Sequence, residues 1–143
     1  MSEATRVTAF AGAEISREIT VTTEVDLDNW TSQVANGIAV GETNVFTTPT
    51  TGWYSLGYSI GFGGVLNSSV FKSCILKIKR NGTSIHNLKH QDSGATGHVD
   101  HTRPFGGSIL VNMTAPTDFI TFTAQSESNR YLVTGFVSLV KVD

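Results

Sequence analysis

Four histidines are the side chains of this 143-residue chain best suited to chemistry, and they are clustered. Imidazoles are common ligands of transition metals, and a symmetry axis could bring several copies of such a cluster together. On an extended strand, however, His86 and His90 would lie about 13 Å apart, too far to share an ion. We therefore expect no metal site and no cofactor. The interpretation that remains is a polar loop that contacts a ligand or senses pH; its candidates are His86, His90, His98 and His101.

Serine and threonine are abundant, but no motif indicates that one of them is an activated nucleophile. A catalytic hydroxyl needs an oriented base, and the strand–turn–helix elbow that often presents it is missing. The segment GFGGV at 61–65 lacks the following helix that a phosphate site requires. We therefore predict that the protein is not an enzyme.

Composition narrows the possible partners. Charged residues make up 15% of the chain, against about 25% in an average soluble protein. The net charge is -2 with no basic block, so nucleic acid is not an expected partner. No stretch has the length of a membrane span or of a signal-peptide core. Cys74, the single cysteine, lies in an apolar run and is expected to be a small core residue.

Alternation with a period of two dominates the sequence, which indicates β-strands. It is clearest over 53–62, where Tyr54, Leu56 and Tyr58 share one face while serine and glycine occupy the other. A strand over 19–27 is expected to carry Ile19, Leu27 and the odd residues between them on one face.

The second half of the chain predicts further strands. A strand ending at Arg80 runs into Asn81-Gly82, the pair typical of a tight hairpin turn. Strands are also expected over 108–113, 119–125 and 131–142, with a polar strand end and loop over 86–107. Short strands separated by turns, without helical periodicity, predict a β-sandwich, jelly roll or barrel.

The closing strand is apolar on both faces. Phe136 and Val140 lie on one parity, whereas Val133, Val137 and Leu139 lie on the other. One sandwich core covers only one face of a sheet, so the other face needs a partner subunit or a large loop. The serine and glycine face of 53–62 would allow another backbone to approach closely. These patterns predict self-association.

The chain resembles the globular head of complement subcomponent q, in the tumour-necrosis-factor-like jelly-roll superfamily. That family has a phenylalanine, five residues, then glycine and alternate aromatic positions. Here Phe46 is followed by TTPTT and by GWYSLGY over 52–58, with Leu56 in place of a phenylalanine. The hairpin LKIKRNGTSI and the closing VTGFVSLVKV also match the family pattern.

The resemblance implies a single-domain, all-β antiparallel jelly roll of about ten strands that forms a homotrimer. We expect an N-terminal arm over 1–18 and the jelly-roll domain over 19–143. The resemblance also implies a non-enzymatic role in binding or scaffolding. Candidates for the trimer interface or the core are Phe46, Trp53, Tyr54, Tyr58, Val133, Gly135, Phe136, Val137 and Leu139.

A bare trimer of this type resembles bacteriophage capsid decoration (cement) proteins and tail-fibre tips. The expected role is therefore a structural protein on the surface of a virus particle, stabilising the head through contact with the major capsid protein or another virion protein. Two alternatives stay open. One is a fibre tip that binds a receptor or a cell-surface glycan, and the other is a secreted, complement-head-like binding module.

Overall fold

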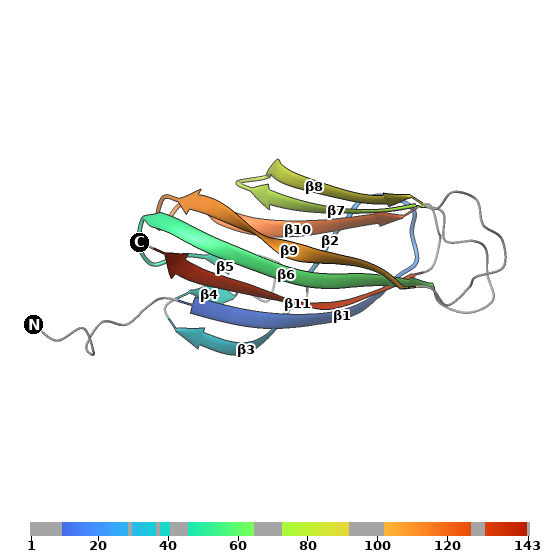
Figure 1. Ribbon diagram of the computed structural model, residues 1–143, viewed down its shortest axis with the longest axis horizontal. Helices are drawn as coiled ribbons and strands as arrows, with labels where there is room; N and C mark the ends of the chain where they lie inside the picture. The colour runs from blue at the N-terminus through green and yellow to red at the C-terminus, as the bar shows by residue number, and fades with distance from the viewer. Residues whose placement is uncertain are drawn as a thin grey trace, which may run out of the picture.

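Two antiparallel β-sheets packed face to face make up the molecule (Figure 1). The computed structural model describes residues 10–28, 30–36, 38–40, 46–64, 73–91, 102–126 and 131–142. These residues form eleven strands and no helix, so the predicted all-β jelly roll is confirmed. Within these ranges, no helix has the length and apolar character needed to cross a membrane.

Sheet A has five strands and sheet B has six. The order in sheet A is β3 (Thr31–Asn36), β1 (Phe10–Ile19), β11 (Tyr131–Val142), β6 (Gly52–Gly64) and β9 (Thr102–Met113). The order in sheet B is β4 (Ala39–Val40), β5 (Phe46–Thr47), β10 (Phe119–Ser126), β7 (Ser73–Arg80) and β8 (Thr83–Gln91). The short strand β2 (Val25–Asp26) also pairs with β10.

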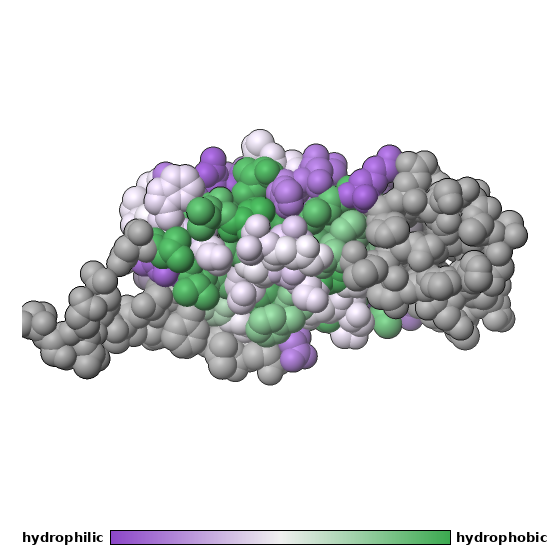
Figure 2. Space-filling view, viewed as in Figure 1, coloured by the Kyte–Doolittle hydropathy of each residue, from purple (hydrophilic) through white to green (hydrophobic). Residues whose placement is uncertain are grey.

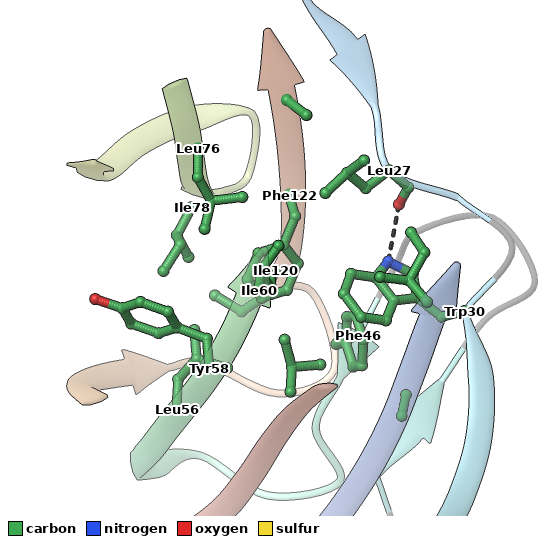
Figure 3. Packing of buried hydrophobic residues seen from close by; sticks show 14 of the residues in the cluster. Leu27, Trp30, Phe46, Leu56, Tyr58, Ile60, Leu76, Ile78, Ile120 and Phe122 are labelled. Carbon is green, nitrogen blue, oxygen red and sulfur yellow. Dashed lines mark hydrogen bonds between the residues drawn. The ribbon is translucent and has the colours of Figure 1, made fainter. Parts of the chain in front are cut away.

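The core lies between the sheets because alternate residues of each strand point inward. On β6 the inward residues Tyr54, Leu56, Ile60 and Phe62 are at most 1% exposed. Ile120 and Phe122 of β10 are fully buried, as the sequence predicted, and so is Cys74 of β7. Figure 3 shows several of these side chains meeting across the space between the sheets.

An aromatic cluster closes one side of the core (Figure 3). The ring centroids of Trp30, Phe46 and Phe122 lie 5.3 to 5.8 Å apart in tilted or edge-to-face arrangements. Such pairs contribute about 0.5–1.5 kcal/mol each beyond burial. The indole Nε1 of Trp30 donates a hydrogen bond of 2.8 Å to the carbonyl oxygen of Leu27, which satisfies its polar atom inside the core.

The expected N-terminal arm differs from what the structure shows. Residues 10–18 belong to β1, which pairs with β11 along its whole length and with β3 on its other side. Ala11, Ala13 and Ile15 alternate inward and are buried. Two of these three side chains are only methyl groups, so their alternation was too weak to predict a strand. Residues 1–9 lie outside the described part of the chain.

The single strand expected over 19–27 is wrong. β1 ends at Ile19, and β2 contains only Val25 and Asp26. The residues between them connect sheet A to sheet B. Ile19 at the end of β1 and Leu27 directly after β2 are buried, whereas Val21 in the connection is 46% exposed. The alternation continued through the connection, so the pattern alone could not show that the chain changes sheets.

The predicted hairpin is confirmed. β7 ends at Arg80, and Asn81 and Gly82 have φ angles of 54° and 82°. Positive φ at both central positions is the geometry of a type I′ turn, whose twist matches that of the flanking strands. β9, in contrast, begins at Thr102, earlier than the strand expected over 108–113.

Candidate functional site

The outer face of sheet A is the candidate functional site. Strand β6 alternates between a bulky inner face and an outer face of Trp53, Ser55, Gly57, Ser59 and Gly61. Trp53 is 50% exposed at the end of this row, although it is one of the largest side chains of the chain. The outward side chains of β6 are therefore small along most of the strand, with one aromatic side chain at its start.

Neighbouring strands add large apolar side chains to the same face. Leu110 of β9 is 64% exposed, and Phe136 and Val140 of β11 are 40% and 37% exposed. Val140 lies directly across from Ser55, which in turn lies across from Leu110, so these residues form one row over three strands. We call the set Trp53, Leu110, Phe136 and Val140 the apolar face.

The surface around the apolar face is weakly polar. Figure 2 shows green apolar surface mixed with pale small residues over strands β6, β9 and β11, and strongly hydrophilic side chains near the margins. The described charges of sheet A that flank this face are Glu14 and Glu18 of β1, both exposed. Contiguous exposed apolar surface of this kind typically marks an interaction site.

Glycine allows close packing inside this sheet. A Cβ atom on Gly135 of β11 would lie 2.3 Å from the carbonyl oxygen of Ser59 and 2.7 Å from Cα of Ile60, both backbone atoms of β6. Gly57 is less restricted, because its Cβ would meet only the side-chain Oγ of Ser138, at 2.9 Å. Gly135 therefore has a structural reason to be glycine.

The predicted interface or core residues divide between two environments. Those buried inside the sandwich are Phe46, Tyr54, Tyr58, Val133, Val137 and Leu139, each at most 7% exposed. Trp53 and Phe136 point outward, where another molecule can reach them, and Gly135 lies against β6. Leu110 and Val140 belong to the same outer face and were missing from the candidate set. Leu110 and Val140 are the sequence neighbours of the inward residues Val111 and Leu139, so alternation alone places them on the outer face.

The edge strands β9 of sheet A and β8 of sheet B lie on the same side of the sandwich and differ in their protection. Among the described residues, β9 pairs only with β6 and β8 only with β7. β8 carries Lys89, and a charged side chain on an edge discourages pairing with other chains. From Phe105 to Met113, β9 has no charged residue and exposes Leu110. β9 carries Arg103 and Pro104 at its start, so the less protected part of this edge is the stretch from Phe105 onward.

The histidine cluster is only partly described. His86 and His90 lie in strand β8 rather than in a loop, because the tight turn at Asn81 starts the strand early. His98 and His101 lie outside the described residues. Within the described ranges, no group of three potential metal ligands is close enough together to hold an ion.

His86 connects the two sheets. Its Nε2 lies 3.3 Å from the hydroxyl oxygen of Tyr58, which reaches across from β6, and the two rings are 6.2 Å apart. Burial raises the pKa of the Tyr58 hydroxyl, so this group stays protonated at physiological pH. A Cβ on Gly107 of β9 would lie 2.9 Å from the same hydroxyl. The contact therefore positions β8 next to the inner side of sheet A.

Charged side chains gather on the outside of sheet B. Glu24 forms two ion pairs of 2.8 Å, from its Oε1 to the Nζ of Lys77 and from its Oε2 to the Nζ of Lys79. These two lysine hydrogen bonds lower the pKa of the Glu24 carboxyl. Arg17 forms an ion pair of 2.5 Å with Asp28 beside the connection between the sheets. The two outer faces thus differ, sheet B being charged and sheet A largely uncharged with four exposed apolar side chains.

Comparison with known proteins identifies the fold. No protein-family model matches the chain, and no curated protein sequence matches it. Three solved structures with similar folds are Eiger TNF from S. frugiperda (TM-score 0.67, 12% identity, 96% of this chain and 94% of that chain), murine APRIL (0.68, 12%, 95% and 100%) and the PRD1 vertex protein P5 (0.64, 14%, 96% and 74%). At these identities the likeness concerns the fold alone. The chain has the jelly-roll fold of tumour-necrosis-factor-like proteins, a fold that a viral vertex protein also has.

Proposed function

We propose that this protein is a non-enzymatic structural component of a virus particle, a homotrimeric decoration (cement) protein that stabilises the capsid. The observation that carries the proposal is the apolar face of sheet A. Its four large side chains are 37% to 64% exposed, and a free monomer would keep them in water. Burying apolar surface is worth about 25 cal/mol per Å2 and is the main driving force of association.

Two arrangements would cover this face. Pairing of two identical faces gives a dimer, whereas contact of one face with a different surface of the next copy can close into a ring. The charge-free stretch of β9 from Phe105 to Met113 is a suitable second surface, because among the described residues its outer side has no pairing strand, and it carries the exposed Leu110. Face-to-edge contact repeated three times gives the homotrimer that the family resemblance implies.

The placement on a virion rests on two supports. The PRD1 vertex protein P5 has this fold, so the fold is compatible with a structural role in a virus particle. A trimer also matches the threefold axes at which capsid subunits meet. A protein at such an axis would bury apolar area between neighbouring subunits and oppose their separation.

The first test is the mass of the isolated protein. Sedimentation at micromolar concentration should give about three times the chain mass of 15.3 kDa. A stable monomer would refute the self-association of the apolar face. A stable dimer would favour face-to-face pairing over the ring.

The second test addresses the partner. Purified protein should cosediment in fixed stoichiometry with expanded, undecorated capsids, and it should raise their resistance to heat. A trimer that leaves such capsids unbound would refute the decoration role while preserving the assembly. Binding to a glycan array instead would support a receptor-binding fibre tip, for which the exposed Trp53 is a candidate stacking surface.

A further inference from the structure

The turn between β7 and β8 contains a sequence that is chemically unstable in flexible chains. In an Asn-Gly pair, the glycine amide nitrogen can attack the Cγ atom of the asparagine side chain. A C–N bond forms, the side-chain nitrogen leaves as ammonia, and water then opens the cyclic imide to aspartate or isoaspartate. Glycine favours this reaction because it has no side chain to hinder the approach of its nitrogen.

Asn81 is exposed to solvent, but both ends of its side-chain amide are bound. Its Nδ2 donates a 2.8 Å hydrogen bond to Oδ1 of Asp118, and its Oδ1 accepts a 3.0 Å hydrogen bond from the backbone nitrogen of Phe119. The backbone nitrogen of Asn81 donates to the carbonyl oxygen of Phe119 at 2.9 Å. The turn is thus attached to the start of β10 by three hydrogen bonds.

Asp118 is fixed in turn by the loop between β9 and β10. Its Oδ2 accepts a 2.8 Å hydrogen bond from the backbone nitrogen of Thr114, and its own nitrogen donates to the Thr114 carbonyl at 2.8 Å. Both loops lie at the end of the sandwich where the C-terminus is marked in Figure 1. The acceptor that binds Asn81 is therefore part of a connected turn cluster.

This geometry opposes the cyclisation. The Asn81 amide points toward residues 118 and 119, so both of its side-chain hydrogen bonds must break before Cγ can turn toward the nitrogen of Gly82. The φ of 54° at Asn81 further restricts the turn to a left-handed conformation. We propose that Asn81 is a latent deamidation site, and that the contacts with Asp118 and Phe119 protect it.

Conversion of Asn81 would disrupt the same cluster. An aspartate would place a carboxylate oxygen where Nδ2 now donates to Asp118, so two negative groups would face each other at hydrogen-bond distance. Isoaspartate would also lengthen the backbone within the turn. Deamidation at this one residue would therefore break the side-chain contact between the β7–β8 turn and the β9–β10 loop, while the pairing of β7 with β10 remains.

The test compares the full-length protein with its Asp118→Ala and Asp118→Asn variants. Each is incubated at mildly alkaline pH, and conversion at residue 81 is followed by peptide mass mapping. A synthetic peptide of residues 77–86 provides the unprotected rate. Thr117→Ala is the matched control, since Thr117 lies in the same loop and its hydroxyl bonds only Thr114 among the contacts described.

The folded protein should deamidate more slowly than the peptide by a factor of about 10 or more, given two hydrogen bonds of about 1 kcal/mol each. Asp118→Ala should recover much of the peptide rate, Asp118→Asn should be intermediate, and Thr117→Ala should match the parent protein. A parent protein that reacts as fast as the peptide would overturn the proposal. The proposal would also be overturned if an Asp118 variant that is folded by circular dichroism deamidates at the same rate as the parent protein.

Discussion

Replacing Leu110 by aspartate should separate the proposed trimer into folded monomers. Leu110 is 64% exposed, and full burial of a leucine side chain is worth about 1.5–3 kcal/mol, so covering its exposed part contributes about 1–2 kcal/mol per copy. A closed trimer contains this contact three times. The variant should lose roughly 3–6 kcal/mol, a factor of about 10² to 10⁴ in the association constant. Desolvation of the new carboxylate adds to this loss.

The assay is sedimentation velocity over a concentration series, with circular dichroism to confirm that the variant is folded. Val21→Asp is the matched control, because Val21 is 46% exposed but lies in the connection between the sheets, away from the apolar face. The control should sediment like the parent protein. A Leu110→Asp protein that remains trimeric at the same concentrations would show that the apolar face does not hold the assembly together.

Three further changes test the fold itself. Gly135→Ala should lower the free energy of unfolding by about 1–3 kcal/mol, since its Cβ would overlap the backbone of Ser59, whereas Gly106→Ala, with 3.8 Å of clearance, should be nearly neutral in urea titrations. Thr123→Val should raise the free energy of unfolding by about 1 kcal/mol, and with it the melting temperature. The reason is that the buried Thr123 hydroxyl has no hydrogen-bond partner within the described part of the chain. The pKa of Glu24 is lowered from 4.5 by its two lysine hydrogen bonds, so this carboxylate stabilises the fold above about pH 4.5, and the contribution disappears as the pH falls through the lowered value. Glu24→Gln should therefore flatten the acid side of the stability curve by at most about 1 kcal/mol, and an unchanged curve would contradict the ion pairs.

Alternation predicted the strands wherever the side chains on the two faces of a strand differ strongly in size. β6 is the clearest case, because bulky residues such as Tyr54 alternate with serine or glycine. The closing strand expected over 131–142 has those bounds in the structure. The turn at Asn81 was equally predictable, since the requirement for positive φ at two successive positions restricts the choice of residues.

The sequence was uninformative where side chains are small or where the chain changes sheets. In β1, the inward residues Ala11 and Ala13 are so small that their burial leaves little hydrophobic contrast. Between Ile19 and Leu27 the alternation persists although most of the segment is not a strand. Local patterns report which residues face apolar surroundings, and they contain no information on which of two sheets supplies those surroundings.

The sequence predicted an apolar interaction surface, but it identified only two of its four residues, Trp53 and Phe136. The apolar character of both faces of the closing strand predicted that one face would lie outside the core, and the structure shows that this is the face of Phe136, which is 40% exposed. The choice between core and interface for Val133, Val137 and Leu139 depended on which parity faces sheet B, and that is a property of the packed sandwich. The structure resolves it, since these three residues are at most 1% exposed.

The separation of the two faces has a consequence for how the protein can change. Residues that hold the sandwich together, such as Tyr54 and Leu139, are buried independently of any second copy, and the four residues of the apolar face contribute little to the interior. Stability and assembly can therefore vary separately, because a substitution at Leu110 leaves the core packing unaltered. Gly135 is an exception, since it lies on the inward parity while its contacts fix β11 against Ser59, whose side chain belongs to the outer face. A displacement of β11 at that position would shift Phe136 as well, so we expect Gly135→Ala to weaken association in addition to lowering stability.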